Sequence, residues 1–514
     1  MGLKDKISER GKKILLSPTV MRWVSDDRVM RGVEGLMDAP SRMKAAWAVL
    51  KNGHDLPAID PAVDDSMGEI DAAAAPSPKP KANGSAAHVP TSARSLGSED
   101  MKESLKERSS LSGIGGRDVF EKCFQFSAAD NARKMGIYPF FRPLDLNDGP
   151  EAVIDGKRVV MFGSNNYLGL TTHPKVREAA KAAIDRFGTS MTGSRLVNGS
   201  MKMHEEFEHK LAAWFGKESA LVFTTGYQVN IATCSALLSN KKSVAVIDRN
   251  VHASLYDGVR LGQSAGARLV RYRHNDAESL DKALEKVDAG EGALVVTDGV
   301  FSAEGEIAKL DELVPVVKKH GARVFVDDAH ALGVIGPGGR GTAHHFGLEN
   351  QVDLMGGTFS KSLASIGGWL VGERKVLDYI RHFAPSFLFA AAAAPPNVAA
   401  AMAAFELMQE ESWRIQKLHD NFTYMRDGLK SLGFDLGHTQ TSVIPIYIRE
   451  DLRTIMMWRD LLEEYGIYTN PFISPGVPPK HAMLRTSYMA THEKTHLDRG
   501  LEAFEKVGKK YGVI

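Results

Sequence analysis

Segments with strand-like and helix-like patterns alternate from about residue 118 to about residue 395, and this alternation constrains the fold more than any other feature. Short apolar runs typical of buried strands lie at residues 220–223, 244–247, 268–272, 292–297, 323–326 and 352–355. Apolar residues recur at helical spacing over residues 175–187, 204–215, 228–238, 277–286 and 310–320. Strand–helix–strand units favour a mostly parallel sheet with helices on both faces. The sequence therefore predicts an α/β fold.

The rhythm changes after residue 395. A long helical pattern over residues 398–411 comes first. Strand-like runs at 442–448 and 482–487 then alternate with helical patterns at 454–465 and 492–511. We therefore expect a smaller C-terminal α+β domain beside the large one.

The segments before the alternating region differ in composition. Residues 72–80 read AAAAPSPKP, and the stretch 54–115 around them has few large apolar residues. Such a stretch cannot bury enough apolar surface to offset its ordering entropy, so we expect a flexible Ala/Pro/Ser-rich linker. The other boundaries that we expect are a helical extension at 1–53, an N-terminal segment of the main unit at 116–160, a large domain at 161–395 and a small domain at 396–514.

Basic residues surround apolar ones at the start of the chain, as at Lys4, Lys6, Ile7, Lys13 and Ile14. A basic amphipathic segment of this kind can lie on an anionic membrane surface. The ordinary alternative is a small helical pair that packs on protein, and we favour it because most amphipathic helices bury their apolar face in protein. Peripheral contact with the inner membrane stays open.

Composition excludes several classes of function. The 64 Lys and Arg residues nearly balance the 63 Asp and Glu residues, so the net charge of +1 gives no sign of a nucleic-acid partner. The two cysteines, Cys123 and Cys234, are far apart and lack metal-ligand spacing, which favours a cytoplasmic protein without a metal site. No stretch is long and apolar enough to span a bilayer.

A single lysine with small and hydroxyl neighbours follows the strand-like run 352–355. The stretch 356–363 reads GGTFSKSL, which places Ser360 and Thr358 one and three residues before Lys361. An amine in such surroundings can form a Schiff base with an aldehyde cofactor, while hydroxyls and backbone amides hold the cofactor's phosphate. From this stretch alone, a polar turn with an exposed lysine is an equal alternative.

Three other strand-like runs are also followed by polar residues. These residues are Asp327 and His330 after 323–326, His252 after 244–247, and Thr225, Gly226 and Tyr227 after 220–223. The carboxyl ends of parallel strands lie at one edge of a sheet, so we expect these side chains to meet Lys361 in one crevice.

The chemistry of these residues suits a pyridine-ring cofactor. An aspartate that follows a buried strand needs a cation, and a protonated pyridine nitrogen is one. His252 could stack on a flat ring, and the helix that starts at Gly226 offers backbone amides to a phosphate. Each residue also has an ordinary alternative. Asp327 could cap a helix, and Asp328 beside it could take the acidic role instead. His252 could be a core histidine.

The same residues carry a family resemblance. The chain resembles the α-oxoamine synthases, a branch of the fold-type I pyridoxal-phosphate enzymes, and within that branch it is most similar to the bacterial serine palmitoyltransferases. The resemblance covers roughly residues 124–514. It rests on the motifs GIYPFFR (136–142), MFGSNNYLGL (161–170), GSRLVNG (193–199), HAS (252–254), DDAH (327–330) and GTFSKS (357–362). It implies a fold-type I aminotransferase-like architecture.

The resemblance also implies roles for individual residues. Lys361 would bind pyridoxal 5'-phosphate and later move protons at the substrate α-carbon. Asp327 would pair with the pyridine nitrogen and His330 with the phenolic oxygen, while His252 would stack over the ring and help to hold the amino acid carboxylate. The residues implied near the phosphate are Thr225, Gly226, Tyr227, Thr358 and Ser360. Those implied near the substrates are Asn165 and Arg485 at the carboxylate, and Ser302 beside the cofactor without an assigned contact.

Two positions depart from the family pattern. Related enzymes have a serine or threonine in the loop that reaches the phosphate of the neighbouring subunit, and here that position is Ala390. Some serine palmitoyltransferases carry a mobile arginine after the asparagine equivalent to Asn470, and here the segment holds Ile473 instead. Carboxylate binding would then fall on Arg485.

The implied activity is a decarboxylative condensation of L-serine with a long-chain acyl-CoA, such as palmitoyl-CoA, to 3-ketodihydrosphingosine. The implied assembly is a homodimer with its active site at the subunit interface. One alternative is a glycine- or alanine-using synthase of the 2-amino-3-ketobutyrate CoA ligase or 8-amino-7-oxononanoate synthase type. Others are a non-catalytic partner subunit, against which Lys361 argues, and an ordinary aminotransferase.

Overall fold

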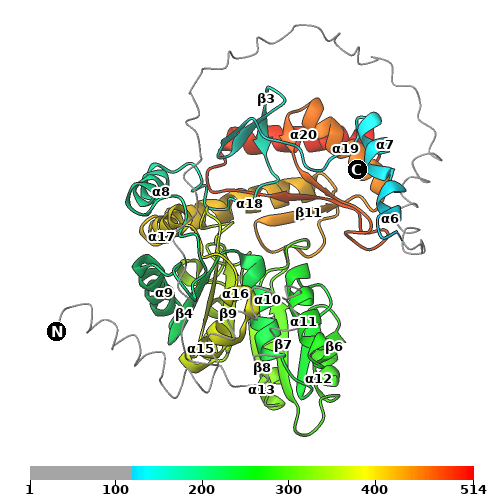
Figure 1. The fold of residues 1–514 in the computed structure, drawn as a ribbon. Coiled ribbons are helices and arrows are strands. Elements are labelled where there is room, and N and C mark those ends of the chain that lie inside the picture. The colour runs from blue at the N-terminus through cyan, green and yellow to red at the C-terminus, as the bar shows by residue number, and fades with distance from the viewer. Residues whose placement is uncertain (1–117) are drawn as a thin grey trace, which may run out of the picture. The chain divides into compact units, whose positions relative to one another are not determined.

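The computed structural model describes residues 118–514 (Figure 1). The helical extension expected at 1–53 and the linker expected at 54–115 lie outside the described residues. Within the described part, the buried apolar residues form two clusters, one around the large sheet and one in the small domain. No helix of the described part is both long enough and apolar enough to cross a membrane.

A seven-stranded sheet forms the centre of the large domain, with strand order β4-β10-β9-β8-β7-β5-β6. The strands are β4 Ser219–Phe223, β5 Ser243–Asp248, β6 Arg268–Tyr272, β7 Gly292–Asp298, β8 Arg323–Asp327, β9 Leu354–Thr358 and β10 Gly368–Gly372. Strand β10 runs antiparallel to β4 and β9, whereas the other neighbours are parallel. Central strands such as β5 are buried along their whole length, as expected for a sheet covered on both faces. The expected mostly parallel sheet is confirmed.

Helices cover both faces of this sheet. They are α8 Pro174–Phe187, α9 Lys202–Phe215, α10 Gly226–Leu237, α11 Ala253–Ser264, α12 Ala277–Leu284, α13 Leu310–Lys319, α14 Thr342–His345, α15 Arg374–Phe383, α16 Pro385–Leu388 and α17 Pro395–Glu410, with a 3-10 turn at Pro337–Gly339. Neighbouring residues of a strand point to opposite faces. A Cβ on Gly356 would meet Val229 of α10, whereas one on Gly357 would meet Trp369, which stacks on Phe215 of α9 at 4.4 Å. Helices α9 and α10 therefore lie on opposite faces.

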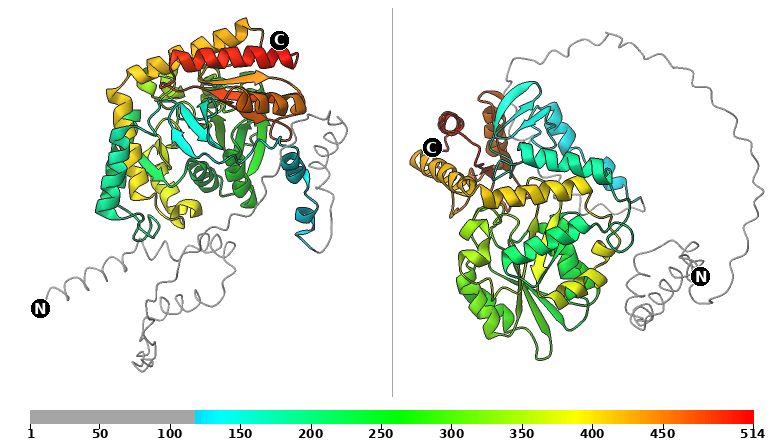
Figure 2. Two further views of the ribbon diagram at one scale, coloured as in Figure 1. Left: turned by 90° about the horizontal axis from the view of Figure 1, so that it is seen from above. Right: turned by 90° about the vertical axis from the view of Figure 1, so that its left-hand side faces the viewer.

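The small domain is built on a three-stranded antiparallel sheet in the order β11-β14-β13. Its elements are β11 Val443–Tyr447, β13 Asn470–Phe472, β14 Met483–Ser487, α18 Trp413–Ser431, α19 Asp451–Glu463 and α20 Lys494–Lys510. The orange-to-red helices α18, α19 and α20 gather at this end of the molecule (Figures 1 and 2). The expected smaller α+β domain is confirmed.

The segment before the large domain joins the small domain. A second sheet has the order β1-β2-β3-β12, and β12 pairs in parallel with β3. The remaining elements are α6 Glu121–Phe124, α7 Ala128–Lys134, β1 Leu146–Asp148, β2 Glu151–Ile154, β3 Lys157–Met161 and β12 Ile467–Tyr468. This pairing links segments that are far apart in sequence, and sequence periodicity gives no sign of it.

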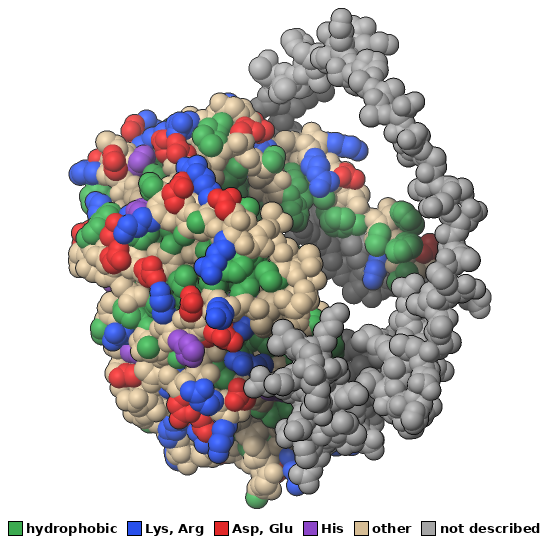
Figure 3. All heavy atoms as spheres, turned by 60° about the vertical axis from the view of Figure 1, so that its left-hand side comes forward, with side chains coloured by type: hydrophobic (Ala, Val, Ile, Leu, Met, Phe, Trp, Pro, Cys, Tyr) green, Lys and Arg blue, Asp and Glu red, His purple; other side chains and the backbone are tan. Residues whose placement is uncertain are grey.

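Several elements differ from the sequence expectations, among them β9, α11 and α18. The strand expected at 352–355 runs instead through Gly356 and Gly357 to Thr358, because the buried sheet leaves almost no room for side chains at these glycines. Helix α11 was not expected, and neither was α18, whose largely polar sequence hides its apolar side. On the face shown in Figure 3, acidic and basic side chains are interspersed rather than gathered into patches of one sign.

Candidate active site

A cavity of about 310 Å³ lies at the carboxyl ends of β7, β8 and β9. This is the edge of a parallel sheet where ligands collect. Residues expected from the sequence that line it are Thr225, Gly226, Tyr227, His252, Asp327, His330, Thr358, Ser360 and Lys361. Asn230, Ser254 and Asp298 line it as well, and sequence reasoning did not single them out.

Lys361 lies three residues after the end of β9, and its side chain is surrounded by protein atoms yet reachable from the cavity. Burial lowers the pKa of Lys361 to about 8, although the nearby Asp327 carboxylate acts in the opposite direction. The turn that carries Lys361 is fixed by the Ser362 hydroxyl, which donates to the Leu332 carbonyl at 2.6 Å. A lysine with a lowered pKa has more of the neutral amine that a nucleophile or base requires.

Asp327 ends β8 with its carboxylate fixed on both sides. Asn230 Nδ2 donates to Asp327 Oδ2 at 2.6 Å, and the Ala329 amide donates to Oδ1 at 2.9 Å. Its neighbour Asp328 is fully buried, accepts from the Thr342 amide at 3.0 Å and does not line the cavity. Burial raises the pKa of Asp328 to about 7. Of the two rival acids, Asp327 is the one that faces the cavity.

His252 caps the N-terminus of α11. Its Nδ1 lies 2.7 Å from Ser254 Oγ and accepts from the Ser254 amide at 3.3 Å. Asn230 Nδ2 also donates to Ser254 Oγ, at 2.8 Å, so one amide group connects the His252 cap with Asp327. Burial lowers the pKa of His252, which favours a neutral ring. Since Nδ1 is the acceptor, the ring proton belongs on Nε2.

His330 contacts a buried tyrosine. Tyr167 Oη lies 2.6 Å from His330 Nδ1 and 3.3 Å from Asn165 Oδ1. Burial lowers the pKa of His330 well below its usual range and raises that of Tyr167 to about 12, so the ring is neutral and the phenol keeps its proton. The shorter contact favours donation from Tyr167 to Nδ1. His330 then has Nε2–H as its donor.

Arg485 lies in β14 of the small domain, next to the same network. Its Nη2 donates to Asn165 Oδ1 at 3.0 Å, and its Nε donates to the Ser302 carbonyl at 2.6 Å. Arg485 is only 3% exposed. Arg485 therefore forms one group with Asn165 and Ser302. This group adjoins the cavity through Tyr167 and His330. Ser302 contacts Arg485 with its backbone carbonyl and not with its side chain.

The N-terminus of α10 and the end of β9 form a polar cradle. Thr225 caps the helix, where its hydroxyl accepts from the Gln228 amide at 3.2 Å. The Thr358 and Ser360 hydroxyls lie 2.7 Å apart. A Cβ on Gly226 would lie only 2.5 Å from Thr358 Cβ, so the two segments can meet only at a glycine. Helix-terminal amides beside two hydroxyls suit a phosphate group.

These residues fit pyridoxal phosphate. The cavity holds a second buried carboxylate, Asp298, whose pKa is raised well above its usual range by burial and by the neighbouring Asp327. The charged form of Asp298 is unfavourable here, and a further positive charge, which a protonated pyridine nitrogen would supply, would stabilise it beside Asp327. The cradle for a phosphate lies beside them. The donor set thus matches the cofactor at its ring nitrogen and at its phosphate.

The structure also shows the surroundings of the two positions that depart from the family pattern. Ala390 belongs to a loop in which the Ala392 amide donates to the Gly193 carbonyl at 2.9 Å, so this loop lies against the GSRLVNG motif. Ile473 is 5% exposed, which makes its position apolar. His492 is structural, because its buried Nδ1 accepts from the Met489 amide at 2.9 Å.

Comparison with known proteins agrees with this site. The family model for aminotransferase class I and II matches residues 157–504. The chain belongs to this family. A serine palmitoyltransferase of Sphingobacterium spiritivorum is 42% identical over 390 residues, which are 76% of this chain and 96% of that protein. An 8-amino-7-oxononanoate synthase of Thermoanaerobacter pseudethanolicus is 40% identical over 386 residues, which are 75% of this chain and 96% of that protein.

Solved structures point to the same part of the aminotransferase class I and II family. The structure of a Sphingomonas wittichii serine palmitoyltransferase is similar with a TM-score of 0.73 and 37% identity, and it covers 77% of this chain and 100% of that one. Both kinds of relative are α-oxoamine synthases, so the expected branch and fold type are confirmed.

Proposed function

We propose that the chain condenses L-serine with a long-chain acyl-CoA, such as palmitoyl-CoA, and releases coenzyme A and carbon dioxide to give 3-ketodihydrosphingosine. The observation that carries this proposal is Lys361, which shares one cavity with Asp327, His252 and His330 at the carboxyl edge of the sheet. Relatives and structures named serine palmitoyltransferase support the serine- and acyl-specific part.

Pyridoxal phosphate bound in the cavity supplies an electron sink for negative charge at the amino acid α-carbon. Asp327 would hold the pyridine nitrogen in its protonated form, since Asn230 and the Ala329 amide fix both carboxylate oxygens. His330 would donate from Nε2 to the phenolic oxygen, and His252 would stack over the ring. The α10 N-terminus with Thr225, Thr358 and Ser360 would bind the phosphate.

Arg485 binds the carboxylate of serine, because a guanidinium fork matches a carboxylate with two parallel hydrogen bonds. Asn165 Oδ1 and the Ser302 carbonyl fix the fork from two sides. Lys361 in its neutral form removes the α-proton, and its lowered pKa of about 8 keeps enough neutral amine for this step.

The bond changes balance around the α-carbon. A carbon–carbon bond forms between the serine α-carbon and the acyl carbonyl carbon, and the thioester carbon–sulfur bond breaks. The thiolate of coenzyme A leaves and takes a proton from solvent. The bond from the α-carbon to the carboxylate then breaks to release carbon dioxide, and Lys361 returns a proton to the α-carbon.

The test is product identification by mass spectrometry with serine, glycine and alanine, each paired with short and long acyl-CoA donors. We expect 3-ketodihydrosphingosine from serine and palmitoyl-CoA as the main product. Lys361→Ala should lose turnover and the visible absorbance of the bound cofactor. A main product from alanine or glycine would overturn the substrate assignment, and full activity of Lys361→Ala would overturn the mechanism.

A second candidate is an 8-amino-7-oxononanoate synthase, which uses alanine. Its support is the relative from Thermoanaerobacter pseudethanolicus, at nearly the same identity as the serine palmitoyltransferases. A spectral titration of the holoenzyme separates the candidates, because the true amino acid substrate shifts the absorbance at far lower concentration than the other.

The active unit that we propose is a homodimer. Large apolar side chains are exposed on the GSRLVNG motif, at Leu196 and Val197, at Ile366 in the cavity lining, and at Phe389 in the loop that holds Ala390. A second copy that covered them would bring its own loop near the phosphate cradle. Sedimentation velocity should therefore give twice the mass of one chain, and a monomer with full activity would contradict the dimer.

A further inference from the structure

A tight hairpin of residues 300–307, hereafter hairpin 300–307, connects the two domains beside Arg485. It follows β7, and its two sides are joined by hydrogen bonds from the Phe301 amide to the Glu306 carbonyl and from the Gly305 amide to the Phe301 carbonyl, both 2.9 Å. An isolated β-bridge joins Val300 to Ile307. The hairpin is thus held together by its own backbone contacts.

The tip of hairpin 300–307 contacts the small domain. The Ser302 carbonyl accepts from Arg485 Nε at 2.6 Å. The Gly305 carbonyl accepts from the Gln440 amide and from Thr441 Oγ1, both at 3.0 Å. Whatever fixes this hairpin therefore also fixes the orientation of the Arg485 guanidinium.

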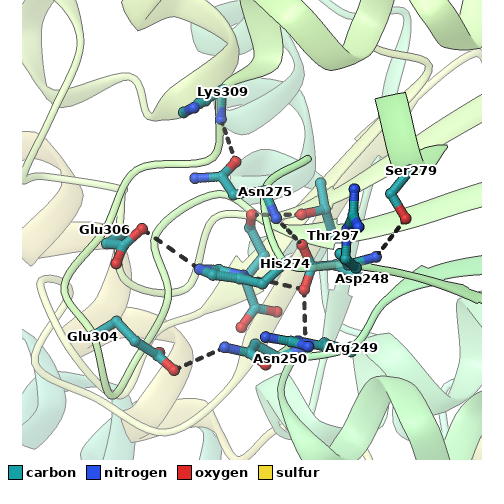
Figure 4. A network of polar contacts seen from close by, with 12 residues as sticks. Asp248, Arg249, Asn250, His274, Asn275, Ser279, Thr297, Glu304, Glu306 and Lys309 are labelled. Atoms are coloured by element: carbon teal, nitrogen blue, oxygen red, sulfur yellow. Dashed lines mark hydrogen bonds and ion pairs between the residues drawn. The ribbon is translucent and has the colours of Figure 1, made fainter. Parts of the chain in front are cut away.

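The base of the hairpin is fixed by two residues that follow β6, His274 and Asn275 (Figure 4). Asn275 Nδ2 donates to the Ile307 carbonyl at 2.9 Å, and Asn275 Oδ1 accepts from the Lys309 amide at 2.8 Å. Asn275 adopts a positive φ of 52°, an uncommon conformation that asparagine tolerates better than most residues. Its two side-chain bonds bracket the end of the hairpin.

His274 lies between carboxylates on two sides. Its Nδ1 is 3.2 Å from Asp248 Oδ1 at the end of β5, and its Nε2 forms an ion pair of 3.6 Å with Glu306 of the hairpin. The His274 ring also meets the Phe301 ring edge-on at 4.3 Å. Figure 4 shows Asp248 on one side of the ring and Glu306 on the other.

The charges in this group favour an imidazolium ion. The ionisable groups that face His274 are Asp248, Glu304 and Glu306, and Asp248 is fully buried. A hydrogen bond from Asn250 Nδ2 to Glu304 Oε1, at 3.0 Å, holds the second hairpin glutamate. Although burial opposes the charge, these acids raise the pKa of His274 to about 9, so the ring is positively charged at neutral pH.

We propose that His274 and Asn275 form a positioning clamp that holds hairpin 300–307 and thereby aims Arg485 at the carboxylate of the amino acid substrate. The clamp touches neither the cofactor cavity nor Lys361, so it acts on amino acid affinity through the Ser302 carbonyl. This role rests on the proposed function, in which Arg485 binds the serine carboxylate.

The first test is His274→Gln, which keeps a hydrogen-bonding side chain but removes the charge. In the holoenzyme we expect the Kd for L-serine, measured by spectral titration, to rise about tenfold. The KM for palmitoyl-CoA and the affinity for pyridoxal phosphate should stay within about twofold. Hydrogen exchange of the Phe301 and Gly305 amides should become about tenfold faster, which reports on the clamp independently of catalysis.

Two further variants sharpen the test. Glu306→Gln keeps the contact between His274 and Asp248 but removes the ion pair to the hairpin, so it should give a smaller change in the same direction. His320→Gln is the matched control, since His320 Nε2 lies 2.6 Å from Asp281 on the outer helices, away from the hairpin. It should leave serine affinity and hairpin exchange unchanged.

The clamp is overturned if serine Kd and hairpin exchange are unchanged in His274→Gln. It is also overturned if affinity for serine, acyl-CoA and cofactor all fall by the same factor, because that pattern indicates general destabilisation. Should His274→Gln fail to fold, Glu306→Gln decides by the same measurements. If serine is not the substrate, the exchange rates still decide whether the clamp holds the hairpin.

Discussion

At the scale of single residues, the hydroxyl of Tyr167 decides which nitrogen of His330 carries a proton. It lies 2.6 Å from His330 Nδ1, and the second acceptor within its reach, Asn165 Oδ1, is already bonded to Arg485. A neutral histidine whose Nδ1 accepts must donate from Nε2. In our proposal Tyr167 therefore acts on the cofactor through His330, and it also lies between that histidine and Asn165, which accepts from Arg485.

Tyr167→Phe should lower kcat while the fold stays intact. The variant keeps the buried ring and loses one hydrogen bond, which is worth about 0.5–1.5 kcal/mol, so we expect kcat to fall about two- to tenfold. Steady-state kinetics at saturating cofactor measure the change. Tyr424→Phe is the control, because it removes a surface hydroxyl that donates to Asp498 at 2.5 Å. Equal activity in both variants would contradict the role of Tyr167.

The lowered pKa of Lys361 predicts the pH dependence of cofactor loading. Only the neutral amine attacks the aldehyde, and the pKa of about 8 lies below the usual 10.5 of a lysine. When apoenzyme is mixed with pyridoxal phosphate, the rate of covalent attachment should rise about tenfold per pH unit below about pH 8 and level off above it. Stopped-flow absorbance gives the profile, and a midpoint near the usual lysine value would show that burial does not lower the pKa.

At the scale of elements, the meeting point of α10 and β9 sets the phosphate cradle. A methyl group on Gly226 would lie 2.5 Å from Thr358 Cβ, so Gly226→Ala must push the helix N-terminus away from the strand end. Overpacking of this kind costs about 1–3 kcal/mol, and we expect the Kd for pyridoxal phosphate to rise about tenfold or more. Fluorescence titration measures it. Gly292→Ala is the matched control, because the nearest atom to its added methyl is 4.0 Å away.

How much of the site the sequence predicts also depends on the elements. Polar residues after apolar runs identified Asp327, His252 and Thr225, because parallel strands bring their carboxyl ends to one edge. Asn230 was missed, since it lies within a helix and its contact with Asp327 depends on how α10 packs against the sheet. Tyr167 was visible only as part of a motif. Its bond to His330 joins residues 163 positions apart, which local pattern cannot reveal.

At the scale of the whole molecule, the described residues 118–514 include the cavity lining and two hydrophobic clusters. The Sphingobacterium spiritivorum relative aligns over 390 residues, which are 96% of its own length. The residues that hold the cofactor and the substrates in our proposal include none from the first 117 positions.

Removal of residues 1–117 separates catalysis from location. Because every proposed contact to cofactor and serine remains, we expect kcat and the KM for serine to stay within about twofold of the full chain. If the basic amphipathic start of the chain binds membranes, the shortened protein should no longer co-sediment with vesicles of anionic lipid, whereas the full chain should. Equal sedimentation of the two proteins would exclude the first 117 residues as the membrane contact. A large loss of turnover without vesicles would instead give these residues a part in catalysis itself.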